Sequence, residues 1–205
     1  MKELIVLASD SQQKAVIEIL LEKRYASLSI RKLMQRQNFD VFAHPNKDPG
    51  VYKEAGQFLS VFEKQYRYAL VLIDSEWEGS PGQNKIKEKI QNDLNQNGWT
   101  DRSSIIVIDP ELEIWVWSSS DEIPEILGQS WDQIHKLAEK HGFWLPEDIK
   151  PHRPKELMDS VLKEGRKHRS AALFQKLAEK ISLRGCQDLA FQDLREKLHE
   201  WFSPG

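Results

Sequence analysis

The sequence has almost no cysteine and no long apolar run. Cys186 is the single cysteine in the 205 residues, which excludes an internal disulfide framework and is typical of a protein kept in a reducing cytoplasm. No apolar stretch approaches the roughly 20 residues that a membrane-spanning helix needs. The first residues lead directly into a short apolar run without a small-residue cleavage site, so no secretory signal is expected. We therefore expect a cytoplasmic protein without a membrane partner.

The sequence also lacks a strong excess of charge of either sign, an internal repeat and a low-complexity tract. The formal net charge is −3, with 30% of the residues charged. Any contact with nucleic acid therefore has to come from a local basic patch, not from the charge of the whole chain. A length of 205 residues is enough for one α/β domain with an appendage, or for two small domains.

Four short runs of strand-forming residues are present in the first half of the chain. They cover residues 4–8, 39–43, 69–73 and 104–108. Residues 31–35 are an alternative for the second strand, but the turn residues that follow 39–43 favour the latter. Helical patterns separate the runs. This alternation predicts an α/β fold in which one four-stranded parallel sheet, built from right-handed crossovers, is flanked by helices.

No strand pattern recurs after residue 118, and the remaining patterns are helical. The predicted helices cover roughly residues 122–141, 154–166, 170–182 and 188–202. We therefore predict an α/β domain over residues 1–118 and a C-terminal helical cap over residues 119–205 that packs against it.

Two acidic side chains follow the third strand. Asp74 and Glu76 lie two positions apart, so in an extended chain they point the same way and can converge on one cation. Oxygen ligands of this kind suit Mg²⁺ or Mn²⁺ better than zinc. The alternative is that Asp74 caps the following helix and Glu76 is solvated.

Further acidic residues follow the first and fourth strands. Asp10 ends the first strand, and Glu111 and Glu113 follow the fourth. The carboxyl ends of parallel strands share one edge of a sheet, so these groups and Asp74 can form one acidic cluster. The alternatives are local: Asp10 as a helix N-cap, and Glu111 and Glu113 as first-turn acids of a helix that begins at Pro110.

The order of these acids resembles the Toprim-like fold, in which an acidic residue follows the first strand and an Asp-x-Asp pair follows the third. That fold is shared by topoisomerases, primases and the nucleases of the overcoming-lysogenisation-defect group. The segment Pro-Glu-Leu-Glu-Ile-Trp at residues 110–115 is similar to one in small Toprim-like proteins of bacterial phage-defence loci. Residues 183–191 are similar to the C-terminal end of those same proteins. The resemblance covers residues 1–118 by topology and the remainder more loosely.

The resemblance implies a Mg²⁺- or Mn²⁺-dependent hydrolase of nucleic-acid phosphodiester bonds that acts in phage defence. The metal would polarise the phosphoryl oxygen and lower the pKa of the attacking water. By match with the family pattern, Asp10, Asp74 and Glu76 would hold the metal. Glu111 or Glu113 would ligate a second ion or orient water.

Two residues depart from the family pattern. Asp10 stands where the family normally has Glu, and Glu76 stands where it normally has Asp. Each change moves the carboxylate by about one methylene, and Mg²⁺ requires near-ideal octahedral geometry. The alternative function is therefore a catalytically silent Toprim-like subunit that binds partner proteins in a defence complex.

Basic residues at two places are candidates for binding the phosphates of DNA or RNA. Lys47 lies in the loop after the second predicted strand, on the same edge as the carboxylates. Arg166, Lys167 and Arg169 form a cluster at the end of a predicted helix. The alternative for this cluster is a solvated helix end, where cations are favoured by the helix dipole.

Overall fold

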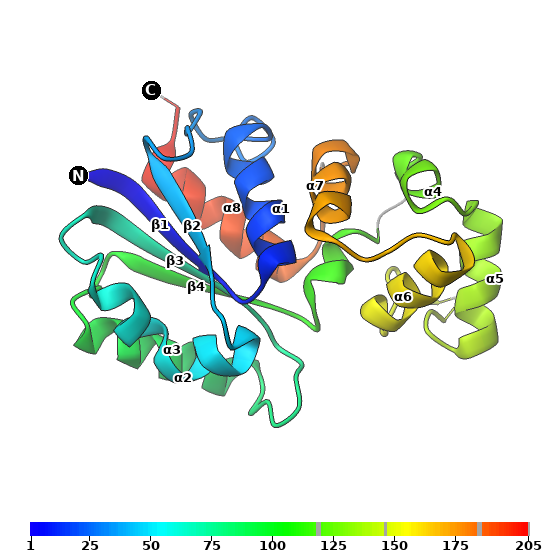
Figure 1. Cartoon of the computed structure of the whole chain (residues 1–205), viewed down its shortest axis with the longest axis horizontal. Coiled ribbons are helices and arrows are strands. Elements are labelled where there is room, and N and C mark those ends of the chain that lie inside the picture. The colour runs from blue at the N-terminus through cyan, green and yellow to red at the C-terminus, as the bar shows by residue number, and fades with distance from the viewer. Residues whose placement is uncertain (118–119, 146, 184–185, 205) are drawn as a thin grey trace.

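The computed structural model describes residues 1–117, 120–145, 147–183 and 186–204 (Figure 1). In chain order the elements are β1 (Lys2–Ala8), α1 (Ser11–Glu22), β2 (Phe39–Ala43), α2 (Lys47–Ser60), β3 (Tyr66–Asp74), α3 (Gln83–Gln96), β4 (Ser103–Ile108), the 3-10 helix η1 (Leu112–Trp115), α4 (Glu122–Leu127), α5 (Trp131–His141), α6 (Pro154–Glu164), α7 (Ala171–Lys180) and α8 (Leu189–Phe202). Among the described residues, no helix is long and apolar enough to cross a membrane.

The strands form one sheet in the order β2-β1-β3-β4, and every neighbouring pair is parallel. Leu4 of β1 lies opposite Phe39 of β2 on one side and Tyr68 of β3 on the other. At the far edge, Asp74 of β3 lies opposite Ile108 of β4. The predicted four-stranded parallel α/β sheet is therefore confirmed, with residues 39–43 as its second strand. The carboxyl ends of all four strands face the same way, which brings the residues that follow them to one edge.

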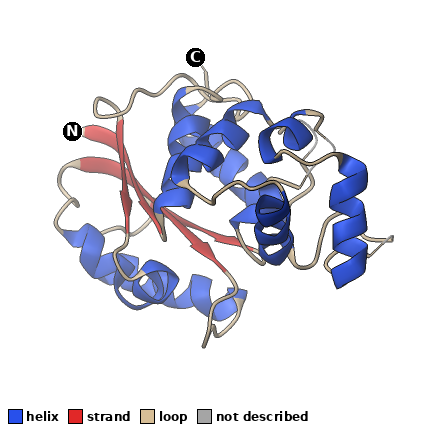
Figure 2. Cartoon of the chain, turned by 45° about the vertical axis from the view of Figure 1, so that its right-hand side comes forward, coloured by secondary structure: helices blue, strands red, loops and turns tan. Residues whose placement is uncertain are grey.

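The sheet is covered by helices on both faces, as Figure 2 shows. Successive side chains of a strand point to opposite faces. Leu4 and Val6 of β1 accordingly join the hydrophobic cluster under α1 and α8, whereas Ile5 and Leu7 join the cluster under α2 and α3. Because both faces are covered, the inner strands are apolar throughout, and this is why the sequence contained continuous rather than alternating apolar runs.

The C-terminal helices share the core of the sheet. Phe191 and Leu194 of α8 are buried in the same cluster as Leu70 of β3, and Trp201 stacks on Tyr68 with ring centroids 4.6 Å apart. In Figure 1, α7 lies beside α1, and α4, α5 and α6 lie beyond the carboxyl ends of the strands. The predicted domain boundary falls at residues 118–119, which are outside the described residues, and it stays a prediction.

The region of the predicted helix 122–141 contains two helices. α4 ends at Leu127 and is followed by Gly128, which has a left-handed φ of 77°. α5 begins at Trp131, after a capping box built by Ser130 and Gln133. Glycine accepts this conformation without steric cost and ends a helix readily. The helical pattern of apolar residues continues across both helices, so the sequence predicted a single helix over 122–141.

The segment after β4 also differs from its prediction, because Pro110 does not begin a helix. The backbone N–H groups of Ser75 and Glu76 donate to the carbonyl of Pro110, at 3.1 and 3.2 Å. Asp109 accepts a hydrogen bond from the Ser75 hydroxyl. These contacts hold the segment alongside the end of β3, and the helix starts only at Leu112, as a single 3-10 turn.

Candidate functional site

Asp74 lies at the end of β3 and is held by three other elements. Its Oδ1 accepts hydrogen bonds from Nε2 of Gln13 in α1, at 2.8 Å, and from the backbone N–H of Leu112 in η1, at 3.1 Å. Its own backbone N–H donates to Oδ1 of Asp48 in α2, at 3.0 Å. Helix α3 is capped by Gly82 instead. The alternative that Asp74 is the cap of the following helix therefore does not hold.

Asp10 is the N-cap of α1, as its local sequence allowed. Its Oδ1 accepts from the backbone N–H groups of Gln12 and Gln13, at 2.8 and 2.9 Å. Asp10 is nevertheless near enough to Asp74 for its negative charge to help raise the pKa of the Asp74 carboxyl. Asp10 thus combines a capping role with a place in the acidic cluster.

Asp48 belongs to the cluster and was missed by the sequence argument. It lies in the first turn of α2, just after β2, and burial raises its pKa. The signal was available, because Asp48 is the acid that follows the second strand. Its place after a strand end is the same feature that indicated Asp10 and Asp74.

The environment of Asp74 strongly favours its protonated form. Burial is the largest cause, and the charges of Asp48, Asp10 and Glu111 add to it, so the pKa of Asp74 lies well above its usual range. The positive charge of Lys155 acts in the opposite direction. Like charges held close together disfavour ionisation of at least one member, and Asp74 is that member here.

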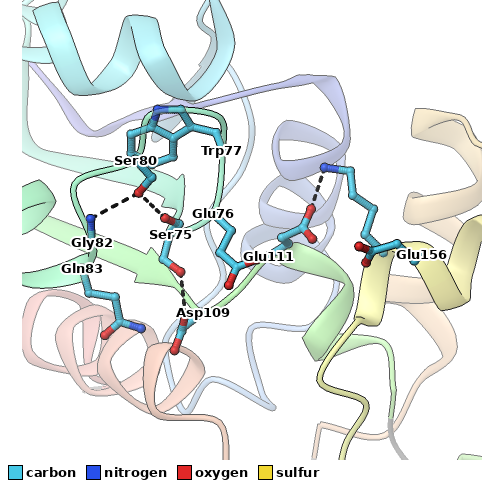
Figure 3. Close-up of a pocket in the computed structure, with 10 residues that line it drawn as sticks. Ser75, Glu76, Trp77, Ser80, Gly82, Gln83, Asp109, Glu111 and Glu156 are labelled. Atoms are coloured by element: carbon cyan, nitrogen blue, oxygen red, sulfur yellow. Dashed lines mark hydrogen bonds and ion pairs between the residues drawn. The ribbon is translucent and has the colours of Figure 1, made fainter. Parts of the chain in front are cut away.

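Glu76 is not brought to Asp74. The extended conformation ends at Asp74, and the backbone of Ser75 and Glu76 turns to bond with Pro110, so the rule for residues two apart no longer applies. Glu76 is exposed, and its charge acts on Arg153. In the close-up of Figure 3 it lies among the residues that line a cleft.

Glu111 and Glu113 are both buried and both paired with cations from the C-terminal region. Oε2 of Glu111 lies 2.5 Å from Nζ of Lys155 in α6. Glu113, whose side chain is 1% exposed, forms an ion pair with Arg169. Arg169 also donates to Oε1 of Gln12, at 2.9 Å. Lys155 was not singled out from the sequence, because no local pattern links it to the strand ends.

A cleft with a volume of about 630 Å³ opens beside these groups (Figure 3). Its lining residues are Ser75, Glu76, Trp77, Ser80, Gly82, Gln83, Asp109, Glu111, Lys155 and Glu156. Carboxylates outnumber cations in this lining, with Lys155 as the single basic member among the described residues. Trp77 packs against Tyr52 of α2, with ring centroids 5.9 Å apart, and supplies an aromatic wall.

The basic residues nominated for nucleic-acid contact are used in different ways. Lys47 is exposed at the start of α2, as expected. Nζ of Lys167 donates to the carbonyls of Ile126 and Glu125 at the end of α4, and Arg169 is drawn into the acidic site. Within the cluster, Arg166 is the exposed member of the three, beside a hollow of about 380 Å³.

The carboxylates do not fit a Mg²⁺ or Mn²⁺ ion held by Asp10, Asp74 and Glu76. In the part of the chain that the structure describes, no three His, Cys, Asp or Glu side chains are arranged to hold a metal ion. Glu76 turns away with the backbone that bonds to Pro110, so it does not join Asp10 and Asp74 around one point. The chemistry that this site offers as it stands is a set of charge-compensated carboxylates beside an open, acidic cleft.

Comparisons of the chain with protein-family models, with curated proteins and with solved structures each give no match.

Proposed function

We propose that the protein is a catalytically silent, Toprim-like subunit that works in the bacterial cytoplasm by binding partner proteins in a phage-defence complex. The observation that carries this proposal is the commitment of the cluster to internal partners. Asp10 and Asp74 accept from donors of the chain itself, and Glu111 is paired with Lys155. The parallel sheet with acids after β1 and β3 supports the resemblance on which the family assignment rests.

The cleft indicates what kind of group a partner would present. Glu76, Asp109, Glu156 and the aromatic side chain of Trp77 line it. Carboxylates attract cations and repel phosphates, and an aromatic ring binds an ammonium or guanidinium group. A basic side chain of a partner protein therefore suits this cleft better than the backbone of a nucleic acid does.

The proposal is tested by two measurements on the purified protein. First, single- and double-stranded DNA and RNA are incubated with it in Mg²⁺ and in Mn²⁺, and no cleavage is expected. Second, a hexa-arginine peptide is titrated calorimetrically against the wild type and Glu76→Gln. Binding that weakens several-fold in Glu76→Gln, but not in the exposed control Glu88→Gln on α3, supports the cleft. Equal binding by all three proteins contradicts it.

A second function, Mg²⁺- or Mn²⁺-dependent hydrolysis of nucleic acid, is favoured by one observation. Asp10, Asp48 and Asp74 lie close enough together to raise the pKa of Asp74, and strongly perturbed carboxyls beside a cleft are common at catalytic sites. If the protein cleaves DNA or RNA with a divalent ion, and Asp74→Ala abolishes the cleavage while the melting curve stays cooperative, this function replaces the first.

A further inference from the structure

Lys155 reaches the acidic cluster from the first turn of α6. Its side chain is 47% exposed, yet its Nζ contacts a Glu111 side chain that is only 8% exposed. Burial acts to lower the pKa of Lys155, but the hydrogen bond and charge of Glu111 and the charges of Asp74 and Asp48 raise it overall. The ammonium group is therefore held at the sheet edge chiefly by Glu111, the carboxylate that it contacts.

Arg169 reaches the same edge from the segment between α6 and α7. It pairs with Glu113, donates to Gln12, and forms an ion pair with Asp159 at 3.0 Å. Its guanidinium also lies over the ring of Phe174, 5.3 Å from the centroid. Burial lowers the pKa of Arg169, and the charges of Asp10, Glu111 and Asp74 oppose that change. A guanidinium stays charged in proteins, so it is a permanent counter-ion.

Both cations come from the helical region, and the buried carboxylates with which they pair, Glu111 and Glu113, follow β4 at the edge of the sheet. We propose that Lys155 and Arg169 are fixed cations that stand in for the divalent ion implied by the Toprim-like resemblance. This inference rests on the proposed function, because it explains how the site remains charge-balanced in a silent subunit. It also explains why the position of α6 matters, because this helix places the ammonium group of Lys155 beside Glu111.

If this is correct, a divalent ion from solution should bind at this site only when the ammonium group of Lys155 has been removed. While Lys155 is present, a divalent ion must compete with an ammonium that is part of the chain and whose local concentration does not fall on dilution. When the ammonium is removed, the buried Glu111 loses its ion-pair partner. A divalent ion that binds the folded protein then stabilises it by mass action.

The experiment compares melting temperatures in EDTA and in millimolar Mn²⁺. Lys155→Met keeps the apolar stem and removes the charge. Because Lys155 is partly exposed, solvent screening limits the expected loss to about 2–6 °C in EDTA. Mn²⁺ should restore most of that loss, whereas the wild type should melt at the same temperature in both buffers. Lys163→Met, an exposed lysine on the same helix, should change neither value.

Further variants separate charge compensation from packing. Lys155→Arg keeps the charge and should show no response to Mn²⁺. Adding Glu111→Gln to Lys155→Met removes the main carboxylate and should reduce the response at least by half. If Lys155→Met does not fold in EDTA, recovery of a cooperative transition in Mn²⁺ supports the proposal equally well.

Three outcomes overturn the inference. In the first, Mn²⁺ raises the melting temperature of the wild type as much as that of Lys155→Met. In the others, Mn²⁺ leaves Lys155→Met unchanged, whether or not it folds, or stabilises Lys163→Met as it stabilises Lys155→Met. These readouts are independent of nucleic-acid cleavage. The inference can therefore fail while the wild type remains silent, and cleavage by the wild type would be recognised separately.

Discussion

The pair formed by Arg169 and Glu113 is expected to be the strongest electrostatic contact between the helical region and the sheet edge. Arg169→Met removes the guanidinium while Glu113 stays in place with a side chain that is 1% exposed. Breaking a buried ion pair from one side costs about 3–5 kcal/mol, because the remaining charge is left without compensation. The Arg169 side chain is 24% exposed, so water reaches part of the site and the lower end of that range applies.

We therefore expect Arg169→Met to lower the free energy of unfolding by about 3 kcal/mol. The contact with Asp159 adds little, because that side chain is 56% exposed and exposed pairs contribute about 0–1 kcal/mol. For a chain of this size, the loss corresponds to a fall in melting temperature of roughly 6–12 °C. Urea unfolding with linear extrapolation measures the free energy, and calorimetry measures the temperature.

Two further variants make this prediction decisive. Arg153→Met removes an arginine from an exposed pair with Glu156 in the same helical region, and it should cost much less than Arg169→Met because exposed pairs contribute little. Combining Arg169→Met with Glu113→Gln removes both charges, and the double variant should recover about 1–3 kcal/mol relative to the sum of the single losses. Additive losses, or a cost for Arg169→Met no larger than that of Arg153→Met, would refute the reasoning.

Two other predictions follow from the site and from the packing of its supporting helices. Because the pKa of Asp74 is raised in the folded protein, its contribution to stability is largest below the ordinary carboxyl range and is lost as pH rises through the folded pKa. Asp74→Asn keeps an oxygen that can accept from Gln13 and Leu112. The variant should therefore be more stable than the wild type at about pH 8, and this advantage should vanish near about pH 4. Urea titrations that give the two proteins equal stabilities at both pH values would contradict this. Gly56→Ala should cost roughly 1–3 kcal/mol, because a Cβ on Gly56 would lie 2.4 Å from the carbonyl oxygen of Asp93 where α2 meets α3. An unchanged denaturation midpoint would show that the two helices separate without cost.

The strands and the cap of α1 were determined by the sequence itself. A short apolar run such as Leu70 to Ile73 has one stable environment, a strand covered on both faces, and the helical patterns between such runs leave only parallel crossovers. Asp10 caps α1 because its carboxylate can reach the N–H groups two and three residues later, and that geometry is local. Features of this kind depend on spacing within a few residues, which the sequence records directly.

The composition of the site was decided only by the tertiary structure. Glu76 is not part of the cluster, because hydrogen bonds from Ser75 and Glu76 to Pro110 turn the chain directly after Asp74. Those bonds join segments that are distant in the sequence. Lys155 was supplied by a helix whose position depends on packing against η1, not on any local pattern. Electrostatic compensation acts through space, and a sequence lists charges without their separations. The strand ends could therefore be found from the residues alone, whereas the partners of each carboxylate could be identified only after the helical region had folded onto them.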